Sequence, residues 1–344
     1  MRAVDIPWMR PVADRLGEGI PAALLIYGIP GVGKGILAND LAQWVLCGNP
    51  TALGQPCDTC SECQLYRSGN HPDFRLITND EGEIKKDSDG NAGDVKKQKQ
   101  IISVNAIRDL AEFSGTKPHR GYAKVVVINP AENLNVSASN ALLKILEEPP
   151  EFLHFILVAK HVESVIPTIR SRCSKQRVNA PTDQMATSWL ASHFSDTPVS
   201  AETASLVLRL SANAPFKVHE LLSDEQFVDA RRFIVSTLTR QPIDIFALAS
   251  FCEKIDVEHL RLIFYALTHD LLIAQAGGKS IFHDDLSEEL NRIRESFSMI
   301  EIIRWNDIFT DYLKSAHHPL NRRLALEALF LQWPQKSRSA RGHR

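Results

Sequence analysis

The stretch Gly28-Ile29-Pro30-Gly31-Val32-Gly33-Lys34-Gly35 decides the fold of this chain. It follows the apolar run Ala23–Tyr27, which predicts a buried strand, and it opens a helical pattern that continues to about Val45. A glycine-rich loop that joins a strand to a helix and carries a lysine near its end is the context of a P-loop. The stretch therefore predicts a phosphate-binding loop within an α/β domain.

Each residue type in this loop has a physical role. Gly28, Gly31 and Gly33 allow backbone N–H groups to turn inward and surround phosphates, and the start of the following helix adds partial positive charge. Lys34 is long enough to reach the outer phosphates of a nucleotide. We expect these four residues to form a degenerate nucleotide-binding site, at which binding of ATP is doubtful.

The groups that hydrolyse a nucleotide are absent from their expected positions. Gly35 stands where an NTPase has the Ser or Thr hydroxyl that holds Mg²⁺. The apolar strand that should end in an Asp and a Glu instead ends in Asn129-Pro130. Glu132 lies two residues further on, and we expect it to be a solvated residue at the start of a helix. The sequence predicts the fold of an ATPase without its chemistry.

Strand and helix signals alternate through the first half of the chain. Phe74–Ile77, Lys124–Ile128 and Phe155–Ala159 predict strands, whereas Val104–Glu112 and Ser137–Glu147 predict helices. Such alternation is typical of a parallel sheet covered by helices. After about Arg177 the strand signals stop and the pattern is helical almost to the end.

Four of the six cysteines, Cys47, Cys57, Cys60 and Cys63, lie within seventeen residues. Two spacings of two residues share the middle cysteine, so one tight turn can offer three sulfurs, and Cys47 can complete a tetrahedron. This ligand set is typical of a closed structural zinc site. An iron–sulfur cluster is the main competitor, and His71 is a spare ligand. A four-cysteine module of this kind more often stabilises the fold than recognises DNA.

The composition is that of an ordinary soluble protein. Of 344 residues, 44% are hydrophobic and 23% charged, and the net charge of −2 offers no bulk attraction to nucleic acid. Neither a signal peptide nor an apolar run of membrane-spanning length is apparent, so we expect a cytoplasmic location. Mixed charges at 79–100 predict a solvated surface loop, and 336–344 predicts a disordered tail.

Several motifs together resemble the clamp-loader AAA+ family. The run Asn140–Pro150 is very similar to the one that follows the second acidic motif in bacterial clamp-loader subunits. Arg170 and Arg172 by themselves are two arginines in a loop, which predict no more than a surface ion pair. Ser171-Arg172-Cys173, however, matches the Ser-Arg-Cys motif of that family. The cysteine cluster matches their zinc module, and His71-Pro72-Asp73 resembles the stretch that follows it. The specific similarity covers roughly Pro21 to Cys173.

Within this family, the degenerate nucleotide motifs resemble those of the delta-prime group rather than those of the ATP-hydrolysing motor subunits. Gly35 and Asn129-Pro130 support that grouping. So does Phe216, which aligns with the lid arginine that senses the γ-phosphate in motor subunits. Lys160 stands at the first sensor position, where a polar residue is usual.

The resemblance implies a three-part architecture and a role. The implied domains are an AAA+ (RecA-like) α/β domain at 1–177 with the zinc module at 47–63, a helical lid at 178–225 and a C-terminal helical collar at 226–335. The implied partners are the motor (gamma/tau) subunits, the delta subunit, the sliding clamp and primed DNA. The implied role is a non-hydrolysing stator of the DNA polymerase III clamp loader that donates Arg172 in trans to a neighbouring ATP site.

Two other functions remain open at this point. The chain could be an active clamp-loader ATPase motor, which would need a different set of Mg²⁺ ligands. It could also be a free-standing zinc-dependent DNA-binding protein, although the near-neutral charge and the long helical C-terminal half argue against that. An ATPase assay and a DNA shift assay on the isolated chain distinguish the three.

Overall fold

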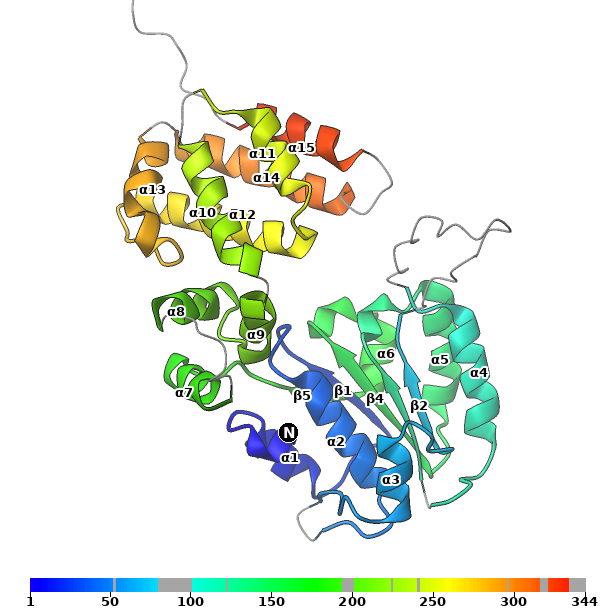
Figure 1. Ribbon diagram of the computed structural model, residues 1–344. Coiled ribbons are helices and arrows are strands. Elements are labelled where there is room, and N and C mark those ends of the chain that lie inside the picture. Colours follow the sequence, from blue (N-terminus) through cyan, green and yellow to red (C-terminus); the bar gives the residue numbers. More distant parts are fainter. Residues whose placement is uncertain are drawn as a thin grey trace, which may run out of the picture. The chain divides into compact units, whose positions relative to one another are not determined.

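The predicted parallel sheet forms the centre of the first of two compact units, Met1–Met185 and Ala186–Arg344 (Figure 1). Its five strands are β1 (Ala23–Tyr27), β2 (Phe74–Ile77), β3 (Lys124–Ile128), β4 (Leu153–Ala159) and β5 (Ser174–Arg177). They lie in the order β2-β3-β4-β1-β5, and every neighbouring pair is parallel. The α/β class and the helical C-terminal region predicted from the sequence are confirmed.

The structure is a computed structural model and describes residues 1–51, 54–79, 101–121, 123–193, 201–223, 225–239, 242–295, 297–315 and 321–333. Residues 80–100 of the predicted charged loop and the predicted tail at 336–344 lie outside the described residues. The predicted division of the chain into α/β, lid and collar domains remains a prediction.

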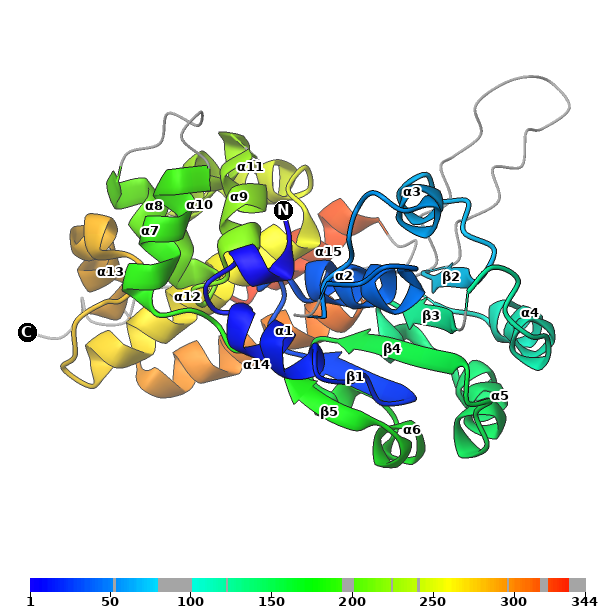
Figure 2. The ribbon, with the colours of Figure 1, turned by 90° about the horizontal axis from the view of Figure 1, so that it is seen from below.

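Helices cover both faces of the sheet. The helices of this unit are α1 (Arg10–Leu16), α2 (Lys34–Leu46), α3 (Ser61–Arg67), α4 (Val104–Gly115), α5 (Val136–Glu147) and α6 (Pro167–Arg172), with 3₁₀ turns η1 (Ala3–Asp5), η2 (Ala131–Asn133) and η3 (Val162–Ser164). Figure 2 shows α2 on one face and α5 and α6 on the other. All five residues of β3 are buried, as expected for a strand covered on both sides.

Most element boundaries agree with the sequence prediction, and the main exception, β5, has a tertiary cause. β1, β2 and β3 have the predicted bounds, and Pro149-Pro150 follows the end of α5. The strand β5 was not predicted, because Ser174–Arg177 is polar and lies at the edge of the sheet, where it pairs with β1 alone. Only tertiary pairing gives such a segment a strand conformation.

The second unit is helical in the residues that the structure describes. Its elements are α7 (Asp183–His193, which begins in the first unit), α8 (Ala201–Leu210), α9 (Pro215–Ser223), α10 (Glu225–Leu238), α11 (Ile245–Cys252), α12 (Val257–Gln275), η4 (Asp284–Leu286), α13 (Ser287–Arg294), α14 (Met299–Ser315) and α15 (Arg322–Leu331). Aromatic rings form much of its core: Phe264 packs 5.2 Å from Trp305 and 4.9 Å from Phe309 between ring centroids. No described helix combines the length and apolar character that crossing a membrane would require.

Asp270 is a buried acid that holds two segments of this second unit together. Its fully buried carboxylate accepts backbone N–H bonds from Ile281, Phe282 and His283 at 2.8–2.9 Å, and the Nδ1 atom of His283 lies 3.1 Å away. Burial acts to raise the pKa of Asp270, but these hydrogen bonds outweigh it and hold the pKa below the usual value. The carboxylate therefore fixes the segment between α12 and η4 onto α12.

Candidate functional site

The P-loop of the first unit has the backbone geometry that its glycines predict. A Cβ atom on Gly28 would lie 2.3 Å from the carbonyl oxygen of Val178, so only glycine allows the chain after β5 to approach this closely. Gly33 has a φ of 95°, in the left-handed region, and forms the N-cap of α2. The loop and helix start expected of a P-loop are therefore both present.

Lys34 is turned toward its own loop. Its Nζ donates hydrogen bonds to the carbonyl oxygens of Gly28 at 2.6 Å and Ile29 at 2.8 Å, and the residue is only 8% exposed. Burial lowers the pKa of Lys34 to about 8, although the negative charge of Glu132 acts in the opposite direction. The ammonium group of Lys34 therefore lies inside the loop, and the phosphates of a nucleotide would have to enter the loop to contact it.

The two positions that supply Mg²⁺ ligands in an NTPase are adjacent in this structure. A Cβ atom built on Gly35 would lie 3.8 Å from Nδ2 of Asn129. The fold therefore brings the first helical turn and the end of β3 together, as P-loop chemistry requires. The residues that meet there are a glycine and an amide, and they offer neither a hydroxyl nor a carboxylate.

Glu132 is not the solvated residue that its position after Asn129-Pro130 predicts. It lies in η2, and both of its carboxylate oxygens are buried without a hydrogen-bond partner among the described residues. The sequence prediction was wrong because the polar run around it resembles a surface helix start, whereas the 3₁₀ turn places the carboxylate within the electrostatic range of Lys34.

A cavity of about 350 Å³ opens beside the P-loop at the carboxyl ends of β1, β4 and β5. Ligands of open α/β sheets usually bind at this edge. Tyr27, Lys160, Glu163 and Arg177 are among the residues that line it. Lys160, at the predicted sensor position, also contributes a positive charge that lowers the pKa of Lys34.

The four clustered cysteines converge on one point. Their Sγ atoms all lie within 4.8 Å of one another, and those of Cys47 and Cys60 are 3.9 Å apart. Tetrahedral zinc with Zn–S bonds of about 2.3 Å requires sulfurs separated by about 3.8 Å. The cluster could therefore bind a metal ion with sulfur movements of an ångström or less, and its dimensions fit zinc.

Backbone geometry holds these sulfurs in place. The N–H groups of Cys57, Cys60 and Cys63 donate to the sulfurs of Cys47, Cys57 and Cys60, respectively, at 3.3–3.4 Å. Backbone hydrogen bonds from Thr59 and Cys60 lower the pKa of Cys57 to about 6, whereas burial raises the pKa of Cys63 to about 12. A bound metal ion would deprotonate all of its thiol ligands.

His71, the predicted spare ligand, serves a different purpose. It is buried outside the cysteine cluster, with Nε2 3.2 Å from Glu62 and Nδ1 accepting the backbone N–H of Asp73 at 3.1 Å. Glu62 also receives hydrogen bonds at 3.1–3.2 Å from Arg120, whose backbone N–H in turn donates to the Asp73 carboxylate. His71 and Asp73 therefore connect the cysteine module to the loop before β3.

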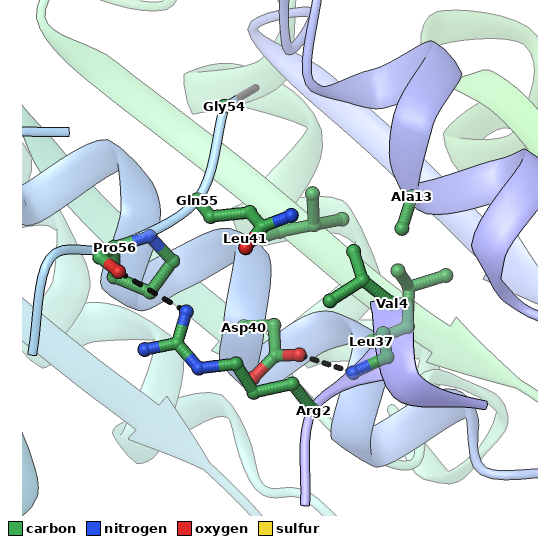
Figure 3. Close-up of a pocket in the computed structure, with 10 residues that line it drawn as sticks. Arg2, Val4, Ala13, Leu37, Asp40, Leu41, Gly54, Gln55 and Pro56 are labelled. Carbon is green, nitrogen blue, oxygen red and sulfur yellow. Dashed lines mark hydrogen bonds between the residues drawn. The ribbon is translucent and has the colours of Figure 1, made fainter. Parts of the chain in front are cut away.

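The N-terminal segment holds the other side of the module. Figure 3 shows the Arg2 guanidinium directed toward Pro56, to whose carbonyl it donates at 3.1 Å. The backbone N–H of Ala3 donates to the carboxylate of Asp40 in α2. Arg2 also forms an ion pair with Asp58 inside the cysteine module. The acids of the module, Asp58 and Glu62, are thus paired with arginines of the same chain. These arginines are therefore engaged within the chain, which does not favour contact between the module and DNA.

Arg172 lies on a helix rather than in the predicted loop. It ends α6, whose first residue is Pro167, and Cys173 is the buried C-cap. Its guanidinium donates to Glu147 of α5 at 2.6 Å and to the carbonyl of Thr168 at 3.1 Å. With 36% of its side chain exposed, Arg172 remains accessible from outside the chain. The ion pair with Glu147 could not be inferred from sequence because twenty-five residues separate the partners.

A comparison with protein family models identifies a match over the first half of the chain. The family model described as "DNA polymerase III, delta subunit" matches residues 16–182, a span that contains the P-loop, the cysteine cluster and Arg172.

Curated proteins provide longer matches. A protein named "DNA polymerase III subunit delta'" from Pseudomonas aeruginosa is 29% identical over 342 residues, which cover 95% of this chain and 96% of that protein. One of the same name from Haemophilus influenzae is 31% identical over 70% of each chain. Among solved structures, a DNA polymerase III gamma subunit-related protein from Thermotoga maritima aligns over 95% of this chain and 99% of its own, with a TM-score of 0.41 and 16% identity.

Proposed function

Because this chain belongs to the family of DNA polymerase III delta-prime subunits, we propose that it acts in the clamp loader as a stator that hydrolyses no nucleotide of its own. The observation that carries this proposal is the meeting of Gly35 and Asn129 at the place where an NTPase binds Mg²⁺. Without a hydroxyl, an Asp or a Glu at that point, the developing charge of phosphoryl transfer has no metal ion to stabilise it.

The proposed contribution of this chain to ATP hydrolysis is Arg172, acting in trans. In an oligomeric AAA+ assembly, the γ-phosphate held by one subunit faces the next subunit. A guanidinium group can bind this phosphate because it is planar, always charged, and donates paired hydrogen bonds that match the spacing of phosphate oxygens. The exposure of Arg172 and its position at the end of α6 support this role. A chain without hydrolytic groups of its own that keeps an accessible arginine here fits a donor that serves another subunit's site.

The proposed partners follow from the same role. A motor (gamma/tau) subunit would present ATP to Arg172, and the delta subunit and further motor subunits would complete the assembly around the sliding clamp and primed DNA. We assign the cysteine cluster a structural zinc ion, because its four sulfurs leave no position open for a substrate or a water molecule. The zinc would stabilise the module between α2 and β2 rather than take part in catalysis.

The test is reconstitution of the clamp loader with Arg172→Ala. DNA- and clamp-stimulated ATPase should fall, by on the order of a thousandfold at the site that Arg172 serves, and clamp loading should fall with it. Arg170→Ala is the matched control, since Arg170 lies on the same short helix and carries the same charge. Assembly and zinc content should be normal in both variants. A complex containing Arg172→Ala that loads clamps at the normal rate would show that Arg172 is structural.

A further inference from the structure

Glu147 is an acid at an unfavourable place in its helix. It is the last residue of α5, and the C-terminal end of a helix carries partial negative charge, which disfavours a carboxylate there. The chain leaves helical geometry at the C-cap residue Glu148, and Pro149-Pro150 prevents the helix from continuing. The carboxylate of Glu147 therefore costs α5 stability unless a cation lies close to it.

Arg172 supplies that cation from the end of another helix. Its Nη2 donates to Oε1 of Glu147 at 2.6 Å, and its Nη1 donates to the carbonyl oxygen of Thr168 in α6 at 3.1 Å. The hydroxyl of Ser171 donates to the same carbonyl oxygen at 2.9 Å. Contacts from α5 and α6 thus hold the two terminal nitrogens of one guanidinium. Arg170, on the same short helix, forms no ion pair with any residue that the structure describes.

The contacts leave most of the guanidinium free to bind a further anion. The group has five N–H donors, of which Glu147 and Thr168 occupy two. The side chain of Arg172 is 36% exposed, so the remaining donors can be approached from outside the chain. An unrestrained arginine samples many rotamers and loses that freedom when it binds a phosphate. An arginine that its own chain already holds loses less, so its guanidinium is preorganised for binding.

We propose that Glu147 is a positioning residue, which holds the guanidinium of Arg172 in the orientation that meets the γ-phosphate of ATP on a neighbouring subunit. This inference rests on the proposed role of Arg172 and adds to it a second residue of the chain, one that acts through Arg172 alone. The opposite role, that of a counter-ion that withholds Arg172 from phosphate, fits less well. Glu147 is 51% exposed, and an ion pair so open to solvent is too weak to compete with a phosphate.

The test is the rate of clamp loading by the reconstituted complex as a function of ATP concentration. Glu147→Gln retains the shape of the side chain and removes its charge. The rate at saturating ATP should fall about two- to fivefold, the fold-change that corresponds to the loss of one exposed ion pair. The ATP concentration that gives half the maximal rate should stay the same, because the P-loop of the motor subunit holds the nucleotide. Loss of structure in this chain would not produce that division between the two values.

Two further variants complete the experiment. Glu151→Gln removes an exposed acid beyond the end of α5 and should leave both values unchanged. Adding Glu147→Gln to Arg172→Ala should cause no fall beyond that of Arg172→Ala, since Glu147 acts through the guanidinium. A normal or faster rate in Glu147→Gln, together with a defect in Arg172→Ala, would overturn the proposal and leave the proposed function intact. A further fall in the double variant would also overturn it, whereas a normal rate in Arg172→Ala would overturn both.

A second measurement tests the contact without the rest of the clamp loader. The side-chain N–H signals of arginine in nuclear magnetic resonance spectra report how freely each guanidinium moves, and Arg172→Ala identifies the signal of Arg172 by its loss. In the isolated chain, Glu147→Gln should make the guanidinium of Arg172 more mobile and leave that of Arg170 unchanged. Equal mobility of Arg172 in wild type and Glu147→Gln would show that Glu147 does not hold it, whatever the role of Arg172.

Discussion

Replacing Cys60 by Ser should remove the metal ion from the cysteine module without disturbing the local backbone. Cys60 is the N-cap of α3, where its sulfur accepts the backbone N–H of Cys63. Serine is one of the best N-cap residues, so Cys60→Ser retains the cap while it deletes a thiolate. Any loss of stability in this variant is therefore attributable to the metal site rather than to the helix start.

The expected magnitude follows from the geometry of the cluster. Four sulfurs already within 4.8 Å of one another need little rearrangement to bind zinc, so nearly all of the binding free energy contributes to folding. Structural zinc contributes about 12 kcal/mol at neutral pH, so loss of the ion should cost at least the share of one of the four thiolates, about 3 kcal/mol. For a unit of this size, about 3 kcal/mol corresponds to a fall in melting temperature of about 6–12 °C.

The assays are elemental analysis and thermal unfolding of the purified chain. Wild type should contain close to one zinc per chain, whereas Cys60→Ser should contain much less and melt earlier; a chelator should lower the melting temperature of wild type alone. Cys252→Ala is the control, because this buried cysteine lies in the other unit and should leave the zinc content unchanged. Full stability in Cys60→Ser protein that has lost its metal would refute the reasoning.

Three other predictions address separate parts of the molecule. Gly35→Thr should gain no ATPase activity in a steady-state assay of the isolated chain. A side chain fits at this position, because a Cβ atom there lies 3.8 Å from Nδ2 of Asn129, but no Asp or Glu completes the Mg²⁺ site. Turnover that Lys34→Ala abolishes would contradict this prediction. Asp270→Asn should lower the free energy of unfolding of the second unit by about 2–4 kcal/mol at pH 7 in urea titrations, whereas the exposed Asp311→Asn should have little effect. Because the pKa of Asp270 is lowered by folding, this difference should be present above about pH 4 and disappear as the pH falls further; a difference that persists at low pH would mean that packing, not charge, is responsible. The isolated chain should give no zinc-dependent shift of DNA, since its net charge is −2 and the acids of its cysteine module are already paired.

Features that depend on local spacing could be predicted from the sequence. The P-loop at 28–35, the strand at Lys124–Ile128 and the four-cysteine cluster each place their defining residues within a short segment. Backbone preferences and periodicity act over that range, so the class of the fold, the absence of Mg²⁺ ligands and the set of four sulfurs were all evident before any tertiary contact was known.

The electrostatic partners of the site required the tertiary structure. Glu132 looks like an exposed acid in the sequence, and only the tertiary structure shows that its two carboxylate oxygens are buried in the 3₁₀ turn after β3. Arg172 was assigned by motif, but its contact with Glu147 depends on the packing of α5 against α6. The polar strand β5 likewise exists only because β1 pairs with it. Charge interactions and edge pairing act through space between residues distant in sequence, whereas periodicity and motif spacing describe only residues that are near one another along the chain.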